Sequence, residues 1–198
     1  GRRLSAEDLH AVADTTFGSW SYVYDDAGNM NQSTSPEGKI VNYTYDDINR
    51  PLTEDETIGG GIETTYAYDA CLNGVGKLCT VTMLSGANTS NTYDPIGNLA
   101  SEVKTINGNA YTTAYTYDRF SNTLSIVYPD NAEVKYTYST AGQLEKIERK
   151  ENGGAFSDVV SNFDYGPHGK ITYQLNGNDT HTVNTYDSTK LYSLSNKK

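Results

Sequence analysis

Tyr22-Val23-Tyr24-Asp25-Asp26-Ala27-Gly28-Asn29-Met30 is the first clear copy of a motif that recurs along the chain. The motif is an aromatic residue, any residue, Tyr and Asp, then a short turn that usually contains Gly or Asn, then Leu, Met or Ile. Its second tyrosine stands at positions 24, 45, 68, 93, 117, 138, 165 and 186, at intervals of 21 to 27 residues. Self-similarity at such intervals indicates a repeat architecture.

The sequence predicts about eight repeats within one domain that spans residues 1–198, with residues 1–21 as part of a preceding repeat. The motifs are expected near residues 22–30, 43–52, 66–78, 91–99, 115–124, 136–144, 163–171 and 184–191. Asn91 and Asn184 replace the first aromatic residue in two copies. The residues expected to define the repeat are Tyr24, Asp25, Gly28, Tyr43, Tyr45, Asp46, Tyr66, Tyr68, Asp69, Tyr93, Asp94, Gly97, Tyr115, Tyr117, Asp118, Tyr136, Tyr138, Gly142, Phe163, Tyr165, Gly169, Tyr186 and Asp187.

Each repeat is expected to contain two strands and two turns. Asp suits the first position of a type I turn, and Gly or Asn tolerates the left-handed conformation that closes it. A second turn signal lies midway between motifs, as in Pro36-Glu37-Gly38 and Asn152-Gly153-Gly154. The stretch 41–45 alternates at period two, which places its tyrosines on one face of a strand. The predicted fold is therefore all-β, a repetitive antiparallel meander of hairpins whose tyrosines form ladders across strands.

Composition supports a sheet and argues against several classes of partner. The chain has 17 Tyr, only five Pro and 20% charged residues, which suits a half-buried pleated surface. A net charge of −10 disfavours nucleic acid and anionic membranes, since both attract clustered Lys and Arg. No stretch approaches the roughly 20 apolar residues of a membrane span. We therefore expect no nucleic-acid partner and no membrane span.

The motif resembles that of the Rhs and YD-repeat family, which includes bacterial Rhs polymorphic toxins, the B and C components of Tc toxins, and teneurins. The resemblance covers essentially the whole chain. It includes Asn73-Gly74-Val75-Gly76-Lys77-Leu78, similar to a recurrent Rhs form with an enlarged turn, and the start 1–4, which resembles the tail of a preceding copy. The terminal Rhs core signature, rich in Arg, Tyr, Asp-Pro and Gly-Arg, is not found.

The resemblance implies a sheet that curls as a spiral, here an open section of an Rhs or YD shell. In the toxins that shell encloses a C-terminal cytotoxic domain, and in teneurins it supports cell adhesion. The implied partners are the remainder of its own shell and an enclosed toxin domain. The implied location is extracellular or on the surface of a bacterium, or export by a secretion system. The expected role is structural, without an enzymatic activity.

Few residues suggest a chemical site. Cys71 and Cys79 flank the enlarged turn, where they form either a disulfide or two reduced cysteines buried as small hydrophobes. His10, His168 and His181 lie apart, so we expect no catalytic, cofactor-binding or metal-binding residues.

Two alternatives concern the surface of the sheet. The repeat tyrosines form either the core and ladder of the sheet or a stacking surface for glycans, as in an adhesion or carbohydrate-binding module. The end strands of an open section expose unpaired backbone, which predicts edge-to-edge self-association.

Overall fold

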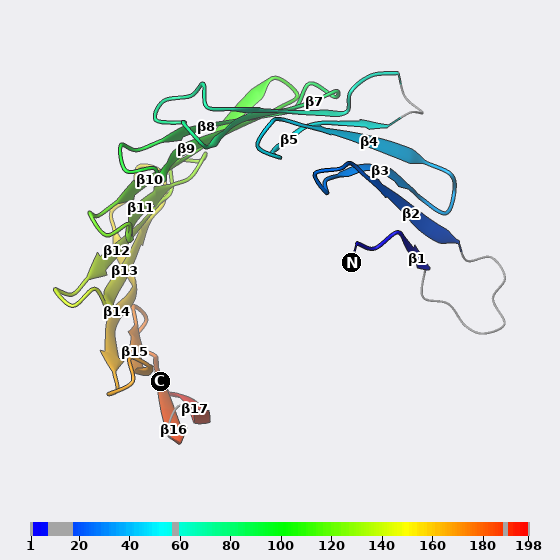
Figure 1. The fold of residues 1–198 in the computed structure, drawn as a ribbon. Helices are drawn as coiled ribbons and strands as arrows, with labels where there is room; N and C mark the ends of the chain where they lie inside the picture. Colours follow the sequence, from blue (N-terminus) through cyan, green and yellow to red (C-terminus); the bar gives the residue numbers. More distant parts are fainter. Residues whose placement is uncertain (1, 8–17, 57–59, 188–189, 198) are drawn as a thin grey trace. The chain divides into compact units, whose positions relative to one another are not determined.

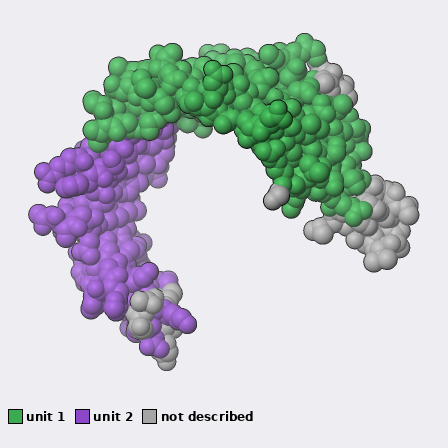
Figure 2. All heavy atoms as spheres, in the orientation of Figure 1, with its two compact units in different colours: residues 1–97, 102–111 green, residues 98–101, 112–198 purple. Residues whose placement is uncertain are grey.

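The computed structural model describes residues 2–7, 18–56, 60–187 and 190–197. The chain divides into two compact units, which Figure 2 shows in different colours. Unit 1 contains residues 1–97 and 102–111, and unit 2 contains residues 98–101 and 112–198, so the division falls within strands β9 and β10. Each unit is built from consecutive antiparallel strands, labelled in Figure 1.

Unit 1 begins with eight strands that pair in chain order. Their bounds are β1 Ser5–Glu7, β2 Ser19–Tyr24, β3 Met30–Thr34, β4 Ile40–Tyr45, β5 Pro51–Glu56, β6 Thr64–Tyr68, β7 Leu78–Met83 and β8 Asn88–Tyr93. Strands β9 (Leu99–Ile106) and β10 (Asn109–Tyr117) contribute to both units.

Unit 2 continues the same arrangement from β10 onward, again with each strand paired to its neighbours in the chain. Its further strands are β11 Thr123–Val127, β12 Glu133–Tyr138, β13 Leu144–Lys150, β14 Ser157–Tyr165, β15 Ile171–Asn176, β16 His181–Asp187 and β17 Lys190–Lys197. All described pairings are antiparallel. The prediction of an all-β meander is confirmed.

The hairpins that carry the motif share a break in strand register. In each of seven described hairpins, the register shifts immediately before the second tyrosine, as between Val23 and Tyr24. Tyr24 then pairs with Met30, and Tyr45 pairs with Pro51 in the same way. A bulge of this kind bends the strand and increases its twist. The repeat therefore fixes a local bend at the same place in each of these seven hairpins.

The second turn of each repeat also forms where the sequence predicts it. The N–H of Gly38 donates to the carbonyl of Ser35 at 2.9 Å, and Gly154 donates likewise to Glu151. Asn107 and Gly108 both adopt positive φ, at 50° and 78°. The turn signal at 58–61 lies partly outside the described residues. Two turns per period explain why the strands follow one another without a crossover connection.

The two faces of the strands differ in character. The face with the repeat tyrosines carries residues such as Val41 opposite Ser33, whereas the other face carries polar pairs such as Thr44 with Thr53, whose Oγ1 atoms lie 2.6 Å apart. Few side chains are deeply buried. The buried apolar residues among those described are Cys79, Ala132, Val160 and Phe163. The described residues contain no helix that is long and apolar enough to cross a membrane.

Candidate functional site: the repeat turn and its tyrosine

The aspartate of the motif closes its own turn through several hydrogen bonds. Oδ1 of Asp25 accepts the N–H groups of Gly28 and Asn29, both at 2.7 Å, and the N–H of Asp25 donates to the carbonyl of Asn29. Gly28 adopts φ of 99°, a conformation that glycine reaches without steric cost. The side chain thus caps the turn, as expected from the local chemistry of Asp.

The same arrangement recurs in other copies with different residues. Oδ1 of Asp118 accepts the N–H groups of Phe120 and Asn122 at 2.8 and 2.9 Å. At the sixth motif, Oγ of Ser139 accepts from Ala141 and Gln143 at 3.2 and 3.1 Å. A hydroxyl therefore replaces the carboxylate as the capping group.

These contacts shift the pKa of the turn carboxyls. The pKa of Asp46 lies below its usual value, chiefly because the backbone N–H of Arg50 donates to it, at 2.8 Å. The pKa of Asp118 is lowered chiefly by the side-chain amide of Asn122. Each carboxylate is thus held ionised by the turn that it caps. The aspartates are engaged in backbone capping.

The second tyrosine of the motif binds the preceding repeat through its hydroxyl. Tyr45 donates to the carbonyl of Met30 at 2.7 Å, and that residue is the one paired opposite Tyr24. The same donor reaches the equivalent carbonyl in five further cases, at 2.7 to 3.0 Å: Tyr24 to Arg3, Tyr68 to Pro51, Tyr93 to Leu78, Tyr165 to Leu144 and Tyr186 to Ile171. This hydroxyl bond between repeats was not predicted from the sequence.

A cation stands beside three of these tyrosines. The Arg50 guanidinium lies 4.3 Å from the ring centroid of Tyr68, and Lys77 Nζ lies 5.8 Å from that of Tyr93. Arg2 approaches the ring of Tyr24 at 5.7 Å. Each cation directly precedes the residue whose carbonyl accepts that tyrosine's hydroxyl. The cation therefore contacts the ring, and the carbonyl of the next residue accepts the hydroxyl of the same tyrosine. A basic residue at this position is a sequence signal for the contact.

Arg50 also joins two successive repeat turns. Its Nε donates to Asp46 of its own turn at 2.6 Å, while Nη1 and Nη2 donate to the two carboxylate oxygens of Asp69 at 3.1 and 2.8 Å. This fork lowers the pKa of Asp69, and Asp69 and Asp46 together raise that of Arg50. A planar guanidinium suits such bidentate pairing, which a lysine cannot reproduce. The contact links the second motif to the third.

Where asparagine replaces the first aromatic residue, it supports the same contact. Asn91 Nδ2 donates to the carbonyl of Leu78 at 3.2 Å, and Tyr93 donates to that oxygen as well. Asn184 likewise shares the carbonyl of Ile171 with Tyr186. The replacement exchanges ring packing for a second hydrogen bond.

The first aromatics of the motif have more varied surroundings. Tyr66 donates to Glu54 at 2.9 Å, and burial, reinforced by that carboxylate, raises its pKa to about 12. The ring centroids of Tyr115 and Tyr117 lie 6.5 Å apart, and so do those of Phe163 and Tyr165. These ring contacts join the two aromatics of one strand. One repeat is linked to the next through tyrosine hydroxyls and cations, and the predicted ladder of rings across strands stays a prediction.

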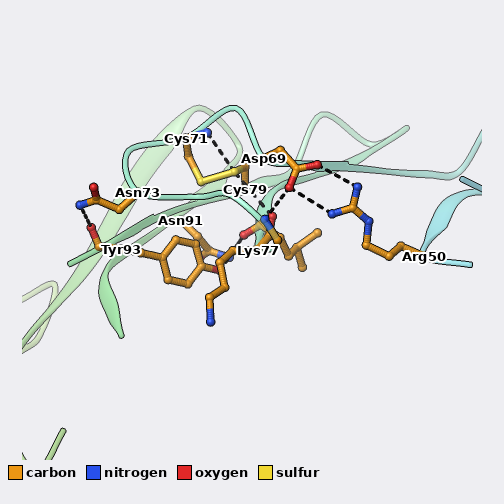
Figure 3. Close-up of a disulfide and its surroundings, with 10 residues drawn as sticks. Arg50, Asp69, Cys71, Asn73, Lys77, Cys79, Asn91 and Tyr93 are labelled. Carbon is orange, nitrogen blue, oxygen red and sulfur yellow. Dashed lines mark hydrogen bonds and ion pairs between the residues drawn. A yellow bond between two sulfur atoms is a disulfide. The ribbon is translucent and has the colours of Figure 1, made fainter. Parts of the chain in front are cut away.

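The third motif departs from the others at its enlarged turn. Tyr68 pairs with Leu78, and Cys71 and Cys79 form a disulfide with Cα atoms 5.4 Å apart (Figure 3). Asp69 itself adopts φ of 71°, and its Oδ1 accepts the N–H of Gly76 at 2.6 Å. Asp69 therefore caps a distant amide of the enlarged turn, unlike Asp25.

Most of the remaining predicted positions fall on turns and strand ends, whereas Tyr43 and Tyr136 lie within strands β4 and β12. Asp94 Oδ1 accepts the N–H of Ile96 at 3.0 Å, and Asp187 ends strand β16 opposite Lys190. The glycines that close turns with positive φ include Gly97, Gly142 and Gly169. At the fifth motif the closing residue is Ser121, with φ of 66°, a left-handed serine that the sequence did not indicate. Tyr43, Tyr136 and Tyr138 are half-buried.

Within the described stretches, no group of His, Cys, Asp and Glu side chains is arranged to hold a metal ion. His181 stacks on Tyr173 with ring centroids 5.5 Å apart, and His168 lies in the turn of the seventh motif. His10 lies outside the described residues. The role of the carboxylates and hydroxyls of the motif is thus to bind backbone groups of the turns and of neighbouring repeats.

The fold of this chain has counterparts among solved structures. No family model matches the sequence, and no curated protein matches it either. Among solved structures, TcdB2-TccC3 matches with a TM-score of 0.80 at 17% identity. This chain has the fold of a Tc toxin segment. The complex TcdB2-TccC3-Cdc42 matches at TM-score 0.78, and a Photorhabdus luminescens Tc holotoxin pore at 0.77, both at 16% identity.

Each of these Tc matches covers 91% of the chain and only 10% of the matched chain. The expected resemblance to the Rhs and YD-repeat family is confirmed at the level of the fold. The chain corresponds to a small part of the length of those Tc proteins.

Proposed function

We propose that this chain is a structural segment of an exported or cell-surface YD-repeat shell. The observation that carries the proposal is the hydroxyl of the second tyrosine, which bonds a carbonyl of the preceding repeat in six motifs. In four of these motifs the aspartate caps a backbone amide of the turn: Asp25, Asp46, Asp69 and Asp94. The polar groups of the motif are thus used to build and connect repeats, as expected of a scaffold.

The proposal extends to what the shell contains. The structural likeness to TcdB2-TccC3 supports a role in enclosing a toxin domain that lies outside this sequence. The partner of this chain in enclosing that domain is then the remainder of its own shell. The Cys71–Cys79 disulfide supports a place outside the cytosol, because disulfides persist in oxidising compartments. The same reasoning makes residues 1–198 a fragment of one repeat domain, and the Tyr24–Arg3 contact supports including residues 1–21 as part of a preceding repeat.

Protease protection of the full-length protein tests the enclosure. A domain that follows the repeats should resist digestion in the intact protein and should be cut once the repeats are loosened by Tyr45→Ala combined with Tyr68→Ala. Tyr111→Ala serves as the matched control, because Tyr111 lies outside the motif and is 45% exposed. A full-length protein with no domain after its repeats, or one whose domain is digested at the same rate in every variant, would refute enclosure.

The alternative is a glycan-binding or adhesion module that uses the tyrosines directly. The hydroxyls of Tyr45 and Tyr93 already donate to backbone carbonyls, which leaves less of their polar edge for a sugar. A glycan array with the wild-type chain and with Tyr43→Ala, Tyr45→Ala, Tyr115→Ala and Tyr117→Ala separates the two functions. Binding that these changes abolish favours the alternative, and absence of binding favours the scaffold.

A further inference from the structure

We propose that the Cys71–Cys79 disulfide is a redox-sensitive clasp that holds the third repeat to the fourth. The enlarged turn binds both backbone polar groups of Tyr93. The carbonyl of Leu72 accepts its N–H at 3.1 Å, and Asn73 Nδ2 donates to its carbonyl at 2.8 Å (Figure 3). Both contacts come from the two residues that follow Cys71. The position of the disulfide therefore decides whether these residues reach the fourth repeat.

The enlarged turn depends on the disulfide more than the shorter turns depend on any one bond. In a shorter turn the aspartate accepts an amide four residues later, as Asp118 does from Asn122. Here the capped amide is that of Gly76, seven residues after Asp69. The intervening chain is a longer loop, and closing a longer loop without a covalent link costs more conformational entropy.

The backbone of the turn is packed directly against the two sulfur atoms. A Cβ added at Gly74 would lie 2.3 Å from Cys71 Sγ and 2.7 Å from Cys79 Sγ. The N–H of Cys71 also donates to Cys79 Sγ at 3.0 Å. Two separate thiols need more room than a bridge, and the chain at Gly74 leaves none. Reduction should therefore push residues 71–77 away from their present positions.

A small dithiol can open the bridge in a balanced exchange. Cys71 is half-buried whereas Cys79 is only 3% exposed, so a thiolate of the reagent attacks Cys71 Sγ. The S–S bond breaks and Cys79 leaves as a thiolate, which takes up a proton. The second thiolate of the reagent then attacks the mixed disulfide and releases Cys71, which is protonated in turn. The dithiol is oxidised to its disulfide as the protein bridge gains two electrons.

The state of the clasp would depend on whether the protein is in an oxidising or a reducing compartment. It is closed in an oxidising exterior and opens where thiols are kept reduced. Opening removes the Leu72 and Asn73 contacts with Tyr93 but leaves the Tyr93–Leu78 hydroxyl bond in place. The expected result is a local loosening between two repeats. This property does not depend on whether the chain belongs to a shell with cargo.

Amide hydrogen exchange of the whole chain tests the clasp, with and without dithiothreitol. Reduction should speed exchange at the N–H groups of Gly74, Lys77 and Tyr93 by about tenfold or more, as local opening predicts. The N–H of Asn122, in a turn of ordinary length in the other unit, should be unchanged. Equal rates at Tyr93 in both redox states would overturn the proposal. Faster exchange at Asn122 as well would also overturn it, because the bridge would then be a global staple.

A second variant tests the contact without touching either cysteine. Asn73→Ala should speed exchange at Tyr93 in the oxidised chain and should reduce the further effect of dithiothreitol there. Asn107→Ala is the matched control, since Asn107 has nearly the same left-handed φ (50° against 53°) but lies in the turn between β9 and β10. If the two variants affect Tyr93 equally, the enlarged turn does not act through Asn73 and the clasp is refuted.

Discussion

Replacing Tyr45 with phenylalanine isolates the hydroxyl that connects the second repeat to the first. The change keeps the ring and removes only the donor to the Met30 carbonyl, a 2.7 Å hydrogen bond in a half-buried setting. A hydrogen bond of this kind contributes about 0.5–1.5 kcal/mol to stability. In a chain of this length, about 1 kcal/mol corresponds to a melting shift of roughly 2–4 °C. We therefore expect Tyr45→Phe to melt a few degrees below wild type.

Thermal unfolding followed by circular dichroism measures this shift, with Tyr111→Phe as control. Tyr111 is exposed and outside the motif, so removing its hydroxyl should change stability by less than about 0.5 kcal/mol. Hydrogen exchange should add a local signature, with faster exchange at the joint between strands β3 and β4. If Tyr45→Phe melts with the control, the hydroxyl contributes nothing to the joint and our account of the repeat is wrong.

Three further perturbations test other contacts of the motif. Arg50→Gln should raise the pKa of Asp69 toward its ordinary value, because the Arg50 side chain is the main group that holds it low. The pKa of Asp46 should rise less, because the backbone N–H of residue 50 remains. Carboxyl NMR titration measures both shifts, and an unchanged Asp69 would contradict the bridge. Raising the pH should destabilise the chain from about pH 10 upward. The pKa of Tyr66 is about 12 in the folded chain and roughly 10 in the unfolded chain, so Tyr66 ionises more readily once the chain unfolds. Alkaline melting followed by tyrosinate absorbance tests this, and a stability that is flat to pH 12 would count against it. Gly74→Ala should prevent the bridge from forming, because its Cβ would clash with both sulfurs, and free-thiol titration should then find two thiols instead of none.

Acid should also destabilise the chain, through the turn carboxyls and not through a tyrosine. The pKa values of Asp25, Asp46, Asp69 and Asp118 lie below the ordinary value near 3.9. Their contribution to stability is complete above that value and is lost as the pH falls through the folded pKa. Melting temperature should thus fall below about pH 4. An acid-resistant chain would show that the caps contribute little.

Those parts of the fold that depend on nearby residues were predictable from the sequence. The Asp25 cap and the left-handed Gly28 both lie within one turn, so local chemistry alone indicates them. The contact from Tyr45 to Met30 spans 15 residues and joins a side chain to a backbone carbonyl. No residue type at position 30 reveals such an acceptor, because every residue has a carbonyl. The tyrosine pattern therefore predicted a ladder but not its hydroxyl bonds.

Other features were hidden for different physical reasons. The cation positions Arg50 and Lys77 each precede the apolar residue of the motif, so a signal was present, but surface basic residues are common and their stacking depends on the strand register. Ser121 adopts a conformation that serine rarely takes, and it does so while its N–H closes the turn on the carbonyl of Asp118. The conformation of Asp69 follows from the enlarged turn, which alters the geometry of its own motif.

In six motifs the hydroxyl of the second tyrosine reaches back to a residue 15 to 21 positions earlier in the chain. During synthesis the acceptor of every such bond is thus made before its donor. Domains fold from the N-terminal end as they emerge from the ribosome. A newly made repeat finds its docking carbonyl already in place, while an earlier repeat does not have to wait for a later one. The direction of these bonds gives the sheet a built-in order of growth, from its first repeat to its last.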